Sequence, residues 1–131
     1  MFLQVMNMEE KEKFLEFVYK IANVDGEYAE EEQEIIDSYK NELELNEIHD
    51  TCDIDGLISY FSGKETSLKK IVLFETIGLV YADDKLVKEE EDILNKITAT
   101  FGLSDEVIEN IKITAKKLQD VYDDVYGVLF D

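Results

Sequence analysis

Carboxylate side chains gather at two points in the chain, each directly after a turn. Residues 23–36 read NVDGEYAEEEQEII, and residues 81–94 read YADDKLVKEEEDIL. Several oxygen ligands held on a turn suit a hard divalent cation. One hypothesis is therefore a weak divalent metal site, of unknown metal identity, with these candidate ligands: Asp25, Glu31, Glu32, Asp83, Glu89 and Glu90.

The spacing does not complete a calcium-binding EF-hand loop. Asp25 and Glu32 are separated like the fifth and twelfth positions of such a loop, but its first position would be Ile21. In the second segment that position would be Leu79, which has no ligand atom either. A metal-free explanation stays open, because Asp-Gly is a common turn and glutamates at a helix start gain about 0.3–1 kcal/mol from the helix dipole.

Helices must position the first acidic turn. Asn7 and Glu10 have the spacing of a capping box, which predicts that a helix begins there. Asp25-Gly26 is expected to end that helix, and a second helix is expected to start near Glu30. The acidic turn is thus predicted to join two helices.

The second acidic turn has the same setting. The helix predicted before it, from about Ser67 to Ala82, is apolar almost all round and should form the buried centre of a bundle. Glu75 interrupts this run. A partly exposed carboxylate is the favoured interpretation, and a ligand inside the bundle is the alternative. The helix after the turn is expected to end at Gly102.

The remaining segments are predicted to add short helices and one long one. NEIHD (46–50) and DIDGLISYF (53–61) are candidates for short helices, the second ending at Gly63. Ser104 is the expected cap of the last helix. The inner stripe of that helix is predicted to be Val107, Ile108, Ile111, Ala115, Leu118, Val121, Tyr122 and Val125.

The two halves of the chain are related by an internal repeat. Residues 14–45 align with residues 72–103 without a gap, at an offset of 58. Each half reads helix, acidic turn, helix. We therefore predict an all-α fold, with residues 1–131 as one domain. It should be a compact bundle of six or seven helices built from two pseudo-symmetric helical hairpins.

The paired segments ANVDGEYAEEEQEII and VYADDKLVKEEEDIL resemble the acidic turns of the tellurite-resistance TerB family and the similar domain of the co-chaperone DjlA. The resemblance covers about residues 8–125. It implies a compact all-α bundle, acidic residues that bind divalent metal, and a non-catalytic role in stress-related assemblies. This chain departs from the family pattern at Ala29, Asp84, Lys85 and Val87, which weakens the implied metal role of the second half.

Charge narrows the classes of partner. The net charge is −19, and none of the 13 basic residues is Arg. Nucleic acid is excluded by repulsion, and anionic membrane surfaces are disfavoured. A protein with a basic surface is the expected partner.

The single Cys52, and an N-terminus without a basic leader, predict a cytoplasmic protein without membrane insertion. The apolar residues 128–130 predict docking on the same bundle or in a homodimer.

No catalytic set emerges from the sequence. His49 is the only histidine, so a cysteine nucleophile would have to pair it with Cys52, and no second motif supports that pair. We expect a non-enzymatic acidic module that binds a divalent cation and docks a protein. The alternatives are a metal-free interaction domain and, least favoured, a metal-dependent hydrolase.

Calorimetric titration with calcium, magnesium, manganese and zinc tests the cation hypothesis. A metal site should give heat and tighter folding, and an Asp25→Asn, Asp83→Asn double variant should lose both because each turn loses one charged ligand. Absence of heat with every metal would favour the metal-free interaction domain.

Overall fold

Every regular element in the described chain is helical. The computed structural model describes residues 2–24, 30–81 and 88–130, and the side chains of Glu31 and Glu32 lie outside that description. Within these ranges there are six α-helices, one short 3₁₀ helix and no strand, which confirms the all-α prediction. In chain order they are η1 (Leu3–Val5), α1 (Met8–Ala22), α2 (Glu30–Leu43), α3 (Ile54–Ser62), α4 (Thr66–Val80), α5 (Lys88–Phe101) and α6 (Asp105–Phe130).

Side-chain caps set several of the helix ends, as the sequence predicts. The Asn7 side chain accepts a hydrogen bond from the Glu10 amide at 2.8 Å, and the Glu10 carboxylate accepts one from the Asn7 amide at 2.9 Å. Together these form the predicted capping box of α1. The Ser104 hydroxyl accepts from the Val107 amide at 3.2 Å and caps α6. Gly102 has a left-handed backbone with a φ of 68°, which suits a residue without a Cβ.

The two halves of the chain share their local structure at the 58-residue offset. Helices α1 and α4 each have 15 residues, α2 and α5 each have 14, and both pairs of helices are displaced by 58 at either end. Glu44, with a φ of 58°, takes the left-handed position that Gly102 takes in the second half. Superposition of the two complete hairpins stays a prediction.

The connection between α2 and α3 is fixed by a buried carboxylate. Glu16 of α1 is almost fully buried and accepts hydrogen bonds from the backbone amides of Thr51 and Cys52, the latter at 3.0 Å. Lys20 and Asp50 form an ion pair beside it. Bonds from α1 therefore hold this segment in place.

The prediction of a short helix at residues 46–50 is wrong, because that stretch is non-helical. Five residues are too few to nucleate a helix without tertiary support. The other short helix is confirmed as α3. The Asp53 side chain caps it by accepting from the Gly56 amide at 2.7 Å, and Gly63 follows its last residue.

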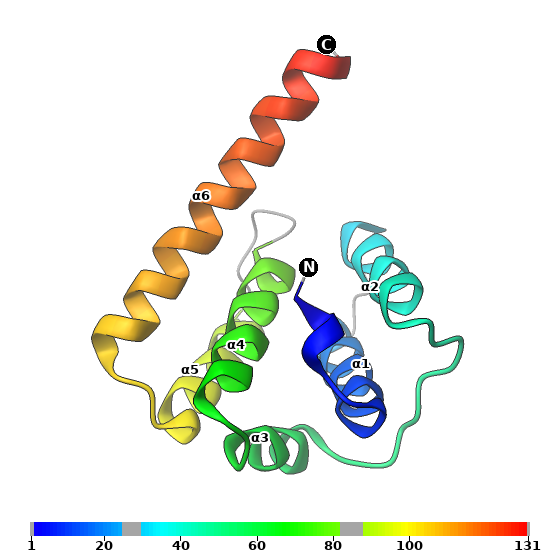
Figure 1. Cartoon of the computed structure of the whole chain (residues 1–131), viewed down its shortest axis with the longest axis vertical. Helices are drawn as coiled ribbons and strands as arrows, with labels where there is room; N and C mark the ends of the chain where they lie inside the picture. Colours follow the sequence, from blue (N-terminus) through cyan, green and yellow to red (C-terminus); the bar gives the residue numbers. More distant parts are fainter. Residues whose placement is uncertain (1, 25–29, 82–87, 131) are drawn as a thin grey trace.

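Helix α4 is the central helix of the bundle. It contacts α1, α3, α5 and α6, which surround it in Figure 1. The apolar cluster around it includes the fully buried aromatic side chains of Phe14, Phe17, Phe61 and Phe101. The prediction that this helix is the buried centre is confirmed, and burial of its apolar surface is the main force that assembles the fold.

Helix α6 is covered over only part of its length. Its 26 residues span about 39 Å, whereas the 15 residues of α4 span about 22 Å. Figure 1 shows α6 continuing beyond the ends of the other helices. Ile108 is buried, but Val121, Tyr122 and Val125 are 55%, 48% and 44% exposed. Their assignment to a buried stripe is therefore wrong, because the bundle ends before α6 does.

The described helices include none with the length and apolar composition needed to cross a bilayer.

Replacing Glu16 with Ala should lower the free energy of unfolding by about 2–3 kcal/mol, because the amides of Thr51 and Cys52 lose a charged acceptor. Urea unfolding measures the change. Glu47→Ala, at an exposed position of the same connection, is the control and should stay within about 0.5 kcal/mol of the wild type. Equal losses in the two variants would contradict this role for Glu16.

Candidate functional site

The acidic turns that the sequence singles out are mostly outside the description. Four of the six candidate metal ligands lie outside the described residues or have side chains that do: Asp25, Glu31, Glu32 and Asp83. At the start of α5, Glu89 is exposed and Glu90 is buried. Across residues 2–24, 30–81 and 88–130, no three His, Cys, Asp or Glu side chains are grouped to hold a metal ion. The metal site at the turns stays a prediction.

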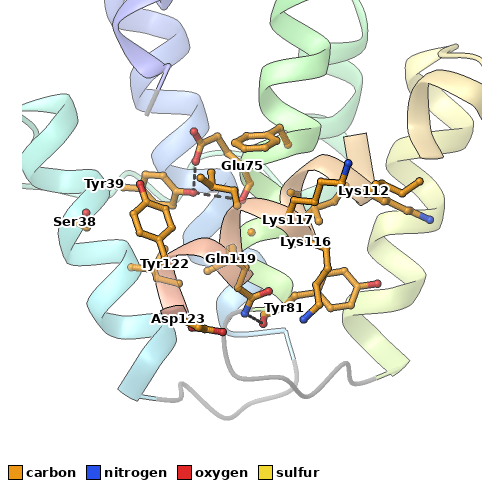
Figure 2. Close-up of a pocket in the computed structure, with 18 of the residues that line it drawn as sticks. Ser38, Tyr39, Glu75, Tyr81, Lys112, Lys116, Lys117, Gln119, Tyr122 and Asp123 are labelled. Atoms are coloured by element: carbon orange, nitrogen blue, oxygen red, sulfur yellow. Dashed lines mark hydrogen bonds between the residues drawn. The ribbon is translucent and has the colours of Figure 1, made fainter. Parts of the chain in front are cut away.

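A groove of about 860 Å³ runs between α2, α4 and α6. Figure 2 shows lining side chains from these three helices; we call the α4 side of the groove its floor and the α2 and α6 sides its walls. Its lining is largely apolar and aromatic, as in many protein binding sites. Representative lining residues are Ile35 and Tyr39 of α2, Phe74 and Gly78 of α4, and Tyr122 and Tyr126 of α6.

Gly78 leaves bare backbone on the floor of the groove. It lies near the end of α4, is exposed, and a Cβ added to it would meet no atom within 4 Å. A glycine inside a helix costs about 0.5–1 kcal/mol relative to Ala. Packing within the described chain does not require it. The missing side chain gives another molecule close access to the backbone of α4.

A hydrogen-bonded pair joins two sides of the groove. The Tyr39 hydroxyl of α2 donates to the Glu75 carboxylate of α4 at 2.9 Å, and both side chains are buried. Burial, reinforced by the neighbouring Glu75 charge, raises the pKa of Tyr39 well above its ordinary value. The sequence-based preference for a partly exposed Glu75 is wrong. A buried partner on another helix, 36 residues away, makes burial of this carboxylate possible.

The α6 wall brings charge to the groove. Lys112, Lys116 and Lys117 line it, followed along the helix by Asp123 (Figure 2). Gln119 donates a hydrogen bond to the backbone oxygen of Tyr81 at 3.1 Å and thereby ties α6 to the end of α4. This wall was not predicted from the sequence, because the apolar side of α6 was assigned to the core. The alternation of Lys and apolar residues along α6 is the sequence pattern that indicates it.

A smaller pocket of about 220 Å³ lies beside α1. The Lys13 ammonium donates a hydrogen bond to the Cys52 sulfur at 3.1 Å, which raises the pKa of Lys13. His49 is exposed, and in the described chain it makes no hydrogen bond to Cys52. The geometry therefore lacks the hydrogen-bonded pair that a Cys–His nucleophile uses. The pocket is lined by Glu12, Lys13, Glu16, His49 and Thr51.

Comparison with known proteins gives no assignment for this arrangement. No protein-family model matches the chain, and neither a curated protein nor a solved structure matches it. The resemblance to the TerB family therefore stays a prediction.

The Tyr39–Glu75 pair should make stability depend on pH in the alkaline range. Unfolded Tyr39 loses its proton near pH 10, whereas folded Tyr39 keeps it, so unfolding releases a proton and stability falls as pH rises. As the pH rises above about 10, the wild type should lose up to about 1.4 kcal/mol per pH unit more than Tyr39→Phe, until folded Tyr39 also loses its proton.

Urea unfolding of both proteins at several pH values measures this difference. The comparison cancels the contributions of the other tyrosines and the lysines, which both proteins share. Parallel pH profiles would show that Tyr39 titrates alike in the folded and unfolded chains.

Proposed function

We propose that this protein is a non-catalytic interaction module that docks an amphipathic helix in the groove between α2, α4 and α6. The observation that carries the proposal is the apolar groove floored by α4, with the bare backbone of Gly78 exposed in it. Grooves of this kind receive the apolar face of a helix, with anchors at helical spacing. Small residues at the contact allow the two helix axes to approach closely.

The dimensions of the groove support a helix as its occupant. Along α6 the lining extends from Glu109 to Tyr126, a rise of about 25 Å. A helix of about 16 residues has the same length. The floor offers the partly exposed Phe74, one helical turn before the exposed Gly78, as an apolar contact. A helix lying along the groove would cover both residues.

The charges around the groove define the polar side of the occupant. Glu42 of α2 and Glu109 of α6 contribute negative charge, and Lys112, Lys116 and Lys117 contribute positive charge. An occupant that carries both signs can pair with this rim. Attraction of a cytoplasmic partner with a basic surface by the net charge of −19 is a hypothesis separate from helix docking in the groove. Cation binding at the acidic turns is a separate hypothesis.

Fluorescence anisotropy with a designed peptide tests the docking function. The probe is an 18-residue helix with a Leu/Ile stripe and a mixed Glu/Lys polar face, and the control is a scrambled peptide of equal composition. The probe should bind saturably and the control should not, because only the probe presents a continuous apolar face.

A Gly78→Gln variant identifies the groove as the binding site. The new side chain fills the floor, and affinity should fall at least about tenfold, equivalent to about 1.4 kcal/mol. Loss of folding does not explain such a result, because Gln is a better helix former than Gly. Gly78→Ala, which leaves most of the space open, is the matched control. Equal binding of the probe and the scrambled peptide would contradict the proposal.

A further inference from the structure

The C-terminal part of α6 is an apolar helix without a cover in the described chain. We define residues 119–130 as the α6 tip. The α6 tip exposes seven large apolar side chains to solvent. Large contiguous apolar patches on the surface of a monomer commonly mark interaction sites. Those side chains, all at least 44% exposed, are Val121, Tyr122, Val125, Tyr126, Val128, Leu129 and Phe130.

The apolar positions of α6 follow the spacing of a helix-pairing seam. Steps of four and three residues alternate along it, as in the a and d positions of a coiled coil. The N-terminal part of the seam packs against the bundle, and its C-terminal part continues into solvent. The seam consists of Ile111, Ala115, Leu118, Tyr122, Val125 and Leu129.

The charges of α6 form three blocks along its length. Three acidic residues begin the helix, three lysines follow and three aspartates come last: Asp105, Glu106 and Glu109; Lys112, Lys116 and Lys117; Asp120, Asp123 and Asp124. Two parallel copies of α6 would place like charges together. Two antiparallel copies would place the lysines of each copy opposite the aspartates of the other, which favours that arrangement.

We propose that the occupant of the groove is the α6 tip of a second copy of this chain. The inference rests on the proposed helix-docking function and names the partner. The helix that fits the groove must be amphipathic and must carry both signs of charge, and α6 meets both conditions. Its own aspartates then face the lysines of the groove wall in the other copy.

The tip fits within the length of the groove. Its 12 residues span about 18 Å, and α6 lines the groove over about 25 Å, from Glu109 to Tyr126. A twofold axis places each tip in the groove of the other copy. One symmetric contact therefore covers both tips and both grooves, and it closes as a dimer without leaving either surface free to extend an assembly.

Sedimentation equilibrium of the full chain tests the proposal, because it measures the mass in solution. The salt concentration is about 0.15 M, where the screening length is about 8 Å and the net repulsion between two acidic chains is reduced. The mass should rise with concentration from 15.2 kDa to twice that value. Val125→Asp places a charge in the seam and should weaken dimerisation at least about tenfold. Thr114→Asp adds the same charge at an exposed position outside the groove and should leave it unchanged.

A charge exchange tests the antiparallel orientation. Lys117→Asp and Asp123→Lys should each weaken the dimer, because each creates like-charge contacts between copies. The double variant, which has the composition of the wild type, should recover most of the affinity because both contacts between copies are restored with reversed sign. Additive weakening in the double variant would overturn the antiparallel arrangement.

The remaining outcomes separate this inference from the docking function. A constant mass of 15.2 kDa up to about 100 µM would overturn the second copy as occupant. If that monomer still bound the designed peptide, the groove would dock a helix of another protein. A dimer that persists in both Val125→Asp and Gly78→Gln would place the contact elsewhere and would also overturn the inference.

Discussion

Helix α4 is apolar on nearly every side, and a helix of that kind is stable in water only when other helices surround it. The chain meets this constraint with α1, α3, α5 and α6, all of which contact α4. The fully buried side chains of Val72, Leu73 and Val80 show how complete the cover is over most of its surface. Burial of apolar area scales with the surface removed from water, so the arrangement of the other helices follows from this one element.

The cover of α4 is incomplete on one side, and the candidate site lies there. Phe74 is partly exposed and Gly78 is exposed, while α2 and α6 stand on either side. The end of α6 lies in solvent for a different reason: α6 is longer than the bundle against which it packs.

Buried carboxylates give this acidic protein its specific internal connections. Glu16 holds the connection before α3, and Glu75 joins α4 to Tyr39 of α2. A buried carboxylate is costly unless hydrogen-bond donors satisfy it, and backbone amides and a tyrosine hydroxyl do so here. These hydrogen bonds fix how the joined segments lie against each other, which apolar packing alone does not specify. The Tyr39–Glu75 bond, for example, sets the position of α2 relative to α4. The many other acidic residues that are exposed give the chain its surface charge.

Local sequence signals were sufficient for most helices. The Asn7–Glu10 capping box, the Ser104 cap and the left-handed Gly102 depend on contacts within a few residues, and each is present where the pattern indicates it. The repeat offset is likewise matched by the helix bounds. The five-residue stretch 46–50 failed as a helix because its conformation depends on its contacts with α1, and a local pattern does not contain them.

By itself, the sequence determined that the chain is all-helical, that its central helix is buried and that its surface is strongly acidic, because composition, periodicity and caps act over short distances. The tertiary structure alone decided that Glu75 is buried against Tyr39 and that the apolar end of α6 is exposed beside a groove. Periodicity identifies the apolar side of a helix, but the lengths and positions of distant helices decide whether anything covers that side.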